Sequence, residues 1–394
     1  MVYLYLYITL SFFSIIFITK KNVYQNIILL NFVIILIFLF GLRNEIGGDW
    51  WVYEKNFNLI KYVTYPENLS LSDYSQYLPS DYILFNAFDF VLSYYSATEW
   101  TFNLISLFFV KIGLPIHFMN LFFTLIFFIS LLVYLKNFEN KFLALTISFP
   151  ILIIVFSVGF LRQSIAFSFF LLAITYLIDN KKNKFLFFII LASLFHISIL
   201  IFAPLFLIVN EKIFEKKNIL RGFSLLIFFI IITILLSQKI YSLFYIYVVN
   251  SFETSQFDLP KGAIYRISLN LIAVVIFLIY SNKICRNVNE YRIYLYLSFL
   301  FIIGFILLPL FPVLVDRINY YLIPLQIFAF VKFTYFYNKQ KYQYLSIISI
   351  IVVYGLVLLT WILFGTHSTY WLPFDNILIN YSNDLFSYDK ILIY

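Results

Sequence analysis

Apolar runs near twenty residues long, separated by short polar stretches, dominate the pattern of this chain. Uninterrupted runs of this length are typical of membrane-crossing helices, whereas barrel strands would alternate in polarity. The pattern therefore predicts one all-α polytopic membrane domain over residues 1–394, a bundle of about 11–13 helices. The candidate spans are Val2–Thr19, Gln25–Leu42, Trp100–Leu114, Ile116–Leu135, Phe142–Val158, Phe160–Ile178, Phe185–Val209, Leu220–Ser237, Ile264–Tyr280, Ile293–Leu310, Ile318–Tyr337 and Tyr344–Phe364.

Basic clusters set the expected orientation, because Lys and Arg concentrate in cytoplasmic loops. These clusters are Lys20/Lys21, Lys181/Lys182/Lys184, Lys212/Lys216/Lys217/Arg221, Lys283/Arg286/Arg292 and Lys339/Lys341. Counting crossings from them places residues 43–99 outside as a long loop and residues 365–394 outside as a tail. A loop as long as 43–99 is usually functional or disordered, and its many aromatic residues disfavour disorder.

The crossing count does not close with simple helices. Phe185–Val209 lies between two basic loops, so it is a re-entrant hairpin or one of those loops is outside. Trp100–Leu135 has a similar problem: either Tyr82–Tyr95 crosses, or the chain turns back near Gly113 and Pro115. Broken or re-entrant helices are tolerated where they are buried in protein or line a cavity, so the pattern points to a functional interior.

Composition supports a membrane protein, at 63% hydrophobic and 12% charged, whereas a soluble chain is about a quarter charged. The net charge of +8 is accounted for by cytoplasmic loops and gives no reason to expect a nucleic-acid partner. The single cysteine, Cys285, and three scattered histidines provide no metal-ligand spacing. No Walker or GxGxxG motif is present, so we expect neither a metal nor a nucleotide cofactor.

The outer loop opens with LRNEIGGDWWVYEKNF, residues 42–57, directly after the second apolar run. Two glycines there allow positive φ or a close backbone approach. Trp50, Trp51 and Tyr53 suit either an interfacial aromatic belt or a platform for sugar rings.

Four arginines fall at predicted outer helix ends on separate segments: Arg43, Arg162, Arg266 and Arg317. Guanidinium groups bind phosphate oxygens bidentately and stay charged, so four of them above an apolar bundle suit a diphosphate whose lipid tail stays in the bilayer. The structural alternatives are a snorkelling side chain at Arg162 and a local Asp316–Arg317 pair.

Transfer of a sugar from a lipid diphosphate needs a general base for the attacking hydroxyl. The candidates are Asp49, Glu99 and His196. Glu99 is equally explained as an acid at a helix N-terminus, and His196 as a hydrogen-bonded buried residue.

Several blocks, in order, resemble the EpsG/Wzy group of bacterial polysaccharide polymerases. They are RNEIGGDWWVYEKNF, EWTFNLISLFF, RQSIAFSFFLLAITYL, KFLFFIILASLFHISILIFAPL, DRINYYLIPLQ with Tyr321, and YWLPFDNIL. Gly48 stands where that pattern usually has Thr, and the residues after Glu99 lack the usual Pro-Gly or Gly-Tyr.

The resemblance implies a GT-C-like multi-helix enzyme at the outer face of the bacterial inner membrane. It would transfer a growing glycan from undecaprenyl diphosphate onto a lipid-linked repeat unit, with membrane lipids and a chain-length regulator as candidate partners. Three alternatives stay open: a transporter or flippase of lipid-linked oligosaccharide, an O-antigen ligase, and another GT-C glycosyltransferase. The lack of paired halves disfavours the transporter.

Overall fold

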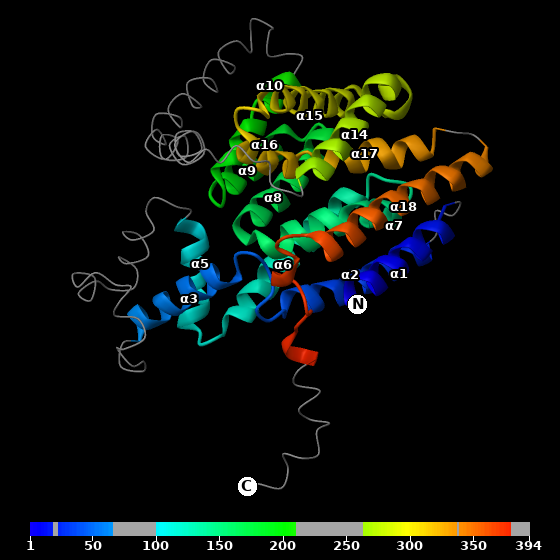
Figure 1. Cartoon of the computed structure of the whole chain (residues 1–394). Helices are drawn as coiled ribbons and strands as arrows, with labels where there is room; N and C mark the ends of the chain where they lie inside the picture. Colours follow the sequence, from blue (N-terminus) through cyan, green and yellow to red (C-terminus); the bar gives the residue numbers. More distant parts are fainter. Residues whose placement is uncertain (19–22, 66–99, 210–262, 337–338, 380–394) are drawn as a thin grey trace, which may run out of the picture.

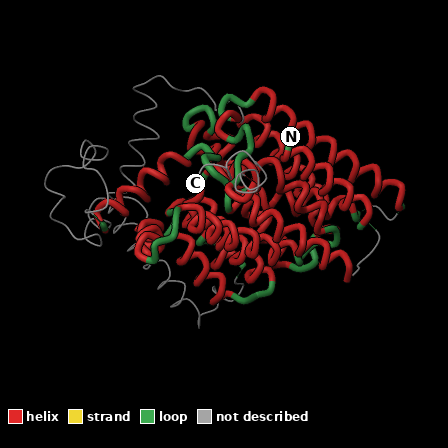
Figure 2. Tube along the Cα trace, turned by 90° about the horizontal axis from the view of Figure 1, so that it is seen from below, coloured by secondary structure: helices red, strands yellow, loops and turns green. Residues whose placement is uncertain are grey.

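A computed structural model describes residues 1–18, 23–65, 100–209, 263–336 and 339–379. Within these ranges the chain is helical with no strand, apart from one isolated antiparallel bridge between Arg43 and Asn376 (Figure 2). Six of the described helices are long and apolar enough to cross a membrane, so the all-α polytopic prediction is confirmed. The predicted segments Leu220–Ser237 and Tyr82–Tyr95 lie outside the described residues.

The bundle follows the chain from α1 to α18 (Figure 1). The elements are α1 Val2–Ile16, α2 Val23–Gly41, α3 Trp50–Thr64, α5 Trp100–Lys111, α6 Ile116–Leu135, α7 Lys141–Ser148, the π-helix η4 Phe149–Ser157, α8 Leu161–Ile178, α9 Lys182–Ser193, the 3₁₀ turns η5 Ile197–Phe202, α10 Leu205–Ile208, α14 Ala263–Ile284, α15 Val288–Leu307, α16 Pro312–Tyr321, α17 Ile323–Thr334, α18 Gln340–Phe364 and η8 Ser368–Tyr370.

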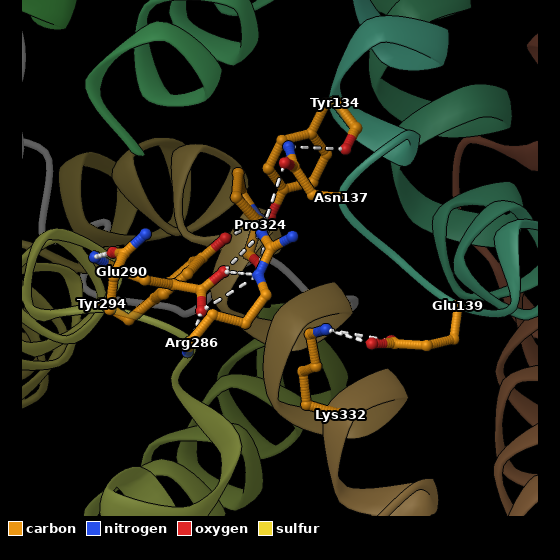
Figure 3. Close-up of polar contacts among 9 residues, drawn as sticks. Tyr134, Asn137, Glu139, Arg286, Glu290, Tyr294, Pro324 and Lys332 are labelled. Atoms are coloured by element: carbon orange, nitrogen blue, oxygen red, sulfur yellow. Dashed lines mark hydrogen bonds and ion pairs between the residues drawn. The ribbon is translucent and has the colours of Figure 1, made fainter. Parts of the chain in front are cut away.

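The two ends of the bundle differ in chemistry. The site end carries Asp49, the start of α8 and α16. The basic end carries the loops from α6 to α7, α8 to α9, α14 to α15 and α17 to α18. At the basic end, Lys332 bonds Glu139 at 2.7 and 2.9 Å, and Arg286 bonds Glu290 at 2.8 Å (Figure 3). The described members of the predicted cytoplasmic clusters therefore gather at one end, opposite Asp49.

Most of the described part of the predicted outer loop 43–99 is a helix. Residues 50–64 form α3, whose inward side buries Trp50, Tyr53, Phe57 and Ile60. Apolar residues recur there at three- and four-residue spacing, which is the pattern of an amphipathic helix, and its polar face obscured it in the search for spans. In Figure 1, α3 and α5 project together from one edge of the bundle.

The chain turns back between α5 and α6, as one of the two sequence alternatives expects. Gly113 takes φ +75° at the turn, a conformation that glycine adopts without strain. Beyond it the helices run antiparallel: the Phe102 and Phe123 rings stack with centroids 5.2 Å apart, and Ser106 bonds Met119 at 3.2 Å. The pair α5–α6 is thus a helical hairpin, and Phe102 near its open end packs against Tyr53.

The segment predicted to be re-entrant reverses direction. α9 rises from the basic end beside α8 and stops at Ser193, and the chain breaks at His196. It then descends through η5 and α10 until the Ile208 carbonyl lies 3.5 Å from Arg292, near the start of α15. The reversal places the irregular backbone around His196 inside the bundle, where protein groups can satisfy it.

Two further crossings are irregular. α7 continues as the π-helix η4, with Pro150 at its start. The predicted span Ile318–Tyr337 is instead two helices, α16 and α17, which meet at Leu322 beside Pro324. Proline lacks an amide hydrogen and so ends the preceding helical pattern. The Pro324 carbonyl accepts from the Tyr134 hydroxyl at 2.9 Å (Figure 3).

Candidate functional site

A carboxylate and two arginines from three separate segments converge at the site end. Asp49 is the N-cap residue of α3, Arg162 is the second residue of α8, and Arg317 lies in α16. The positive charges of both arginines act on the Asp49 carboxylate. The Tyr53 hydroxyl, one turn along α3, donates to Asp49 Oδ2 at 3.3 Å, and the Arg162 guanidinium lies 5.7 Å from the centroid of the same ring.

Burial raises the pKa of Asp49 above its ordinary value, against the opposing pull of Arg162, Arg317 and the Tyr53 hydrogen bond. Burial wins because a carboxylate loses more hydration here than its partners return. The result is a carboxyl group that is a stronger proton acceptor than a fully hydrated aspartate, placed beside two fixed cations. This pairing fits a general base next to an anion site.

Arg43 has a structural position that does not fit the predicted diphosphate contact. Its side chain is 1% exposed, and each guanidinium nitrogen donates to a backbone carbonyl: Nη1 to Phe40 at 2.6 Å, Nε to Ile46 at 3.1 Å and Nη2 to Val158 at 3.2 Å. Burial lowers the pKa of Arg43 to about 10, which leaves it charged at neutral pH. The guanidinium links the loop 43–49 to the end of η4, so it holds the loop that carries Asp49 in position.

The segment after α18 packs against the same loop and against η4. Trp371, 3% exposed, donates from Nε1 to the Ile154 carbonyl of η4 at 3.0 Å. A Cβ added at Gly159 would lie 2.7 Å from the Trp371 ring, and one at Gly48 would lie 3.2 Å from it. Both glycines therefore make room for the indole. Trp371 belongs to a block that carries the family resemblance, but nothing in the sequence places it against residues more than 200 positions away.

Gly47 and the antiparallel bridge between Arg43 and Asn376 complete the geometry of the loop 43–49. Gly47 takes φ +120° and its amide donates to the Tyr370 carbonyl at 2.9 Å. The Asn44 side chain bridges the Asp375 carboxylate at 3.0 Å and His117 Nε2 at 3.0 Å. Residues 43–49 are thus held by α6, η4 and residues 370–377 together, which fixes Asp49 at the start of α3.

Arg266 also departs from its predicted role. It makes a two-pronged bond with Asp316, Nε to Oδ1 at 2.8 Å and Nη2 to Oδ2 at 2.7 Å, and its guanidinium lies 4.9 Å from the centroid of the Tyr320 ring. Asp316 is thus held mainly by Arg266 of α14, while the charge of Arg317, its partner in the structural alternative, also acts on it. The carbonyl of Arg317 accepts from Gln163 Nε2 at 3.4 Å, which joins α16 to the start of α8.

His196 lies at the reversal of the re-entrant segment and is partly exposed. Its Nδ1 is 2.6 Å from Ser198 Oγ and 3.4 Å from the Tyr321 hydroxyl, and Ser198 donates to Tyr321 at 3.2 Å. The contacts among His196, Ser198 and Tyr321 are compatible with a structural role for His196 and with a catalytic one. They join two irregular points of backbone, the His196 break and the α16–α17 break.

The predicted sugar platform is only partly accessible. Trp51 is 54% exposed, whereas Trp50, Tyr53 and Tyr321 are 2%, 3% and 0% exposed, and Tyr53 carries the Asp49 contact. The Tyr321 ring packs among Phe156, Phe167, Phe170 and Phe202, so no sugar face can reach it in this arrangement. Glu99 lies outside the described residues. Groups of three or more His, Cys, Asp or Glu residues able to hold a metal are absent from the described part of the chain.

Comparison with known families places the chain. The model of the EpsG family matches residues 26–376, which include every site residue described above. A search of curated proteins and a search of solved structures each found no match. The match covers most of the sequence, so this chain belongs to the EpsG family, and membership supports a role of the polysaccharide-polymerase type for this multi-pass membrane protein.

Proposed function

We propose that this protein is a glycosyltransferase that joins lipid-linked oligosaccharide repeat units into a polysaccharide. The growing glycan is carried on undecaprenyl diphosphate and is transferred onto a second lipid-linked unit. The site end faces the outside of the bacterial inner membrane, because the opposite end carries the basic loops. The observation that carries the proposal is the convergence of Asp49 with Arg162 and Arg317.

Arg162 and Arg317 form the diphosphate clamp in this account. They come from different helices, α8 and α16, and both act on one carboxylate, so their charges converge on a common region. Negative charge develops on the diphosphate as the glycosyl bond breaks, and cations held in place by the fold stabilise that charge without rearranging. Lipid remains the anchor, so the clamp needs to recognise the diphosphate and not a nucleotide.

Asp49 acts as the general base. The acceptor hydroxyl oxygen forms the new bond to the anomeric carbon of the donor, and the bond from that carbon to the diphosphate oxygen breaks. The electron pair of the broken bond leaves with the diphosphate, and the hydroxyl proton passes to Asp49. The raised pKa of Asp49 suits this transfer, because a base is most effective when its pKa approaches the working pH.

Diphosphate binding should also strengthen the base. Arg162 and Arg317 pull the pKa of Asp49 down, against the effect of burial. When a diphosphate takes up the charge of both guanidinium groups, that pull weakens and burial dominates further. The donor would thereby activate the base that receives the acceptor proton.

Trp51 is the accessible aromatic candidate for a sugar face. It stands next to Trp50, two residues from Asp49, and its ring is 54% exposed at the start of α3. Aromatic faces bind the apolar side of sugar rings while leaving hydroxyl groups free.

The proposal is tested by the surface glycan of cells that lack this gene. If the protein joins repeat units, a ladder of glycan lengths collapses to a single unit on its normal anchor. Complementation with the wild-type gene restores the ladder, and Asp49→Asn does not. Loss of all surface glycan, with lipid-linked units retained on the cytoplasmic side, would instead indicate a flippase. Full-length free polymer that fails to reach its anchor would indicate a ligase.

A further inference from the structure

α16 is a short helix, ten residues long, whose polar side chains point in several directions. Two of them, Asp316 and Asn319, form hydrogen bonds with residues one turn apart on α14. Asp316 takes both prongs of Arg266, and one turn further along Asn319 accepts from Asn270 Nδ2 at 3.0 Å through its side chain and at 3.2 Å through its carbonyl. The two contacts together fix both the height and the rotation of α16 against α14.

The contact between Asn270 and Asn319 is anchored by a chain of buried side chains, two amides and a phenol. The Asn270 amide oxygen accepts from Gln326 Nε2 at 2.7 Å, and the Gln326 amide oxygen accepts from the Tyr354 hydroxyl at 2.7 Å. Asn270, Gln326 and Tyr354 are each no more than 1% exposed. A polar chain in such surroundings is costly unless every member is paired, and pairing makes its geometry rigid. It connects α14, α17 and α18 behind α16.

Ring contacts also fix α16. Tyr320 stacks on Phe156 of η4, with centroids 4.9 Å apart and planes inclined by 23°, and the Arg266 guanidinium lies 4.9 Å from the centroid of the same ring. Tyr321 bonds Ser198 in the re-entrant segment. α16 is therefore held between α14, η4 and the re-entrant segment, and the direction of Arg317 follows from that setting.

We infer that Arg266 and Asn270 are positioning residues, which set the rotation of α16 so that Arg317 faces Asp49 and Arg162, and that Arg266 does not itself bind the diphosphate. This inference rests on the proposed function and assigns the fourth outer arginine to support of the clamp. Both prongs of the Arg266 guanidinium are committed to Asp316, and its face is covered by Tyr320. The Arg266 side chain is only 13% exposed, so little of it remains accessible to a ligand.

A double-mutant cycle separates the two roles of Arg266. The full-length protein is reconstituted in proteoliposomes, and initial rates are measured against the concentration of undecaprenyl-diphosphate-linked repeat units isolated from cells lacking the gene. The variants are Arg266→Lys, Arg317→Lys and both together. Lysine keeps the charge and loses the two-pronged geometry. Arg266→Lys should raise KM for the lipid-linked unit roughly tenfold, as for one lost charge-assisted hydrogen bond.

If Arg266 acts through Arg317, the double variant is no worse than Arg317→Lys alone, because the misplaced group is already impaired. If Arg266 binds the diphosphate independently, the two increases in KM multiply, and the inference is overturned. Asn270→Leu is a second test of the positioning role, since it removes the hydrogen bonds to Asn319 without changing any charge. It should raise KM in the same non-additive way with Arg317→Lys, whereas an unchanged KM would contradict a positioning role.

Arg286→Lys is the matched control. Arg286 holds Glu290 by Nε at 3.1 Å and Nη2 at 2.8 Å, a comparable pair at the basic end of the bundle (Figure 3). It should lower stability in detergent without changing KM. An increase in KM as large as that of Arg266→Lys would mean that general loosening explains both.

The cycle also separates failure of this inference from failure of the proposed function. If Arg317→Lys and Arg162→Lys both retain wild-type kinetics, the diphosphate clamp fails, and the positioning role falls with it. If both are impaired and the Arg266 effect multiplies, the clamp stands and the inference alone fails.

Discussion

The guanidinium of Arg162 lies 5.7 Å from the centroid of the Tyr53 ring, while the hydroxyl of the same tyrosine donates to Asp49 at 3.3 Å. One side chain thus spaces the proposed clamp from the proposed base. The tyrosine therefore contacts both groups at once, and a cation near an aromatic ring is stabilised by about 0.5–2 kcal/mol. The site holds opposite charges near each other and still has a fixed arrangement.

Tyr53→Phe should keep the ring beneath Arg162 and remove the hydrogen bond to Asp49. That bond favours the carboxylate, so its loss raises the pKa of Asp49 further. A base must be deprotonated to act, so the acidic limb of the rate–pH profile should move to higher pH. The rate at neutral pH should fall roughly three- to tenfold.

Tyr65→Phe is the control for Tyr53→Phe. Within the described residues, the Tyr65 hydroxyl donates to the Lys111 carbonyl at 3.4 Å, away from Asp49. Its profile should match wild type. An acidic limb of Tyr53→Phe that stays in place would exclude Asp49 as the group titrating in that limb.

Arg43→Ala should act on stability. It removes donors from three buried carbonyls, and each buried acceptor left unpaired costs about 1–3 kcal/mol. We expect the free energy of unfolding to fall by roughly 3 kcal/mol, since the gaps relax in part. The unfolding temperature in detergent measures this directly. A variant with normal stability but no polymer would instead make Arg43 a ligand of the substrate.

Gly159→Ala should disturb the start of α8. Its Cβ would lie 2.7 Å from the indole of Trp371, which is buried and hydrogen-bonded and so cannot move freely. Overpacking of this kind costs about 1–3 kcal/mol. The double variant Gly159→Ala/Trp371→Ala should be no less stable than Trp371→Ala alone.

Gly304→Ala tests whether any glycine substitution has this effect. Its Cβ would meet only Val315, at an ordinary 3.6 Å, so its unfolding temperature should stay within a degree or so of wild type. A loss as large as that of Gly159→Ala would show that the contact with Trp371 is not the cause.

Orientation can be tested with single cysteines in a Cys285→Ser background. Thr366→Cys lies on the exposed segment after α18 at the site end, and Asn183→Cys is exposed at the basic end. In spheroplasts, a membrane-impermeant maleimide should label Thr366→Cys at once and Asn183→Cys only after lysis. The reverse pattern would place the site end in the cytoplasm.

The helical architecture was predictable because membrane crossings are long apolar runs, and the crossing count pointed to an irregular segment within Phe185–Val209. The helix α3 was missed because its polar face lowers its hydrophobicity below that of a span. The break at Leu322 was missed although Pro324 marks it, because the surrounding segment forms one mostly apolar run in the sequence.

Three of the charged residues selected from the sequence lie together at the site end, but the contacts of the others were not predicted. Asp49, Arg162 and Arg317 were identified because charges at the ends of apolar helices are costly and so conspicuous. The same reasoning selected Arg43 and Arg266, whose partners are carbonyls of η4 and a carboxylate of α16. Such partners depend on tertiary packing. Local sequence does not show which partner a guanidinium at a helix end will have.

The most direct test uses the purified protein in proteoliposomes, supplied with undecaprenyl-diphosphate-linked repeat units and nothing else. The account predicts a ladder of longer lipid-linked glycans, with release of undecaprenyl diphosphate at each step. Arg162→Ala, Arg317→Ala and Asp49→Asn should each lower the rate by about 100-fold or more. Movement of intact units across the bilayer without any ladder, or full activity in Arg162→Ala, would contradict the account.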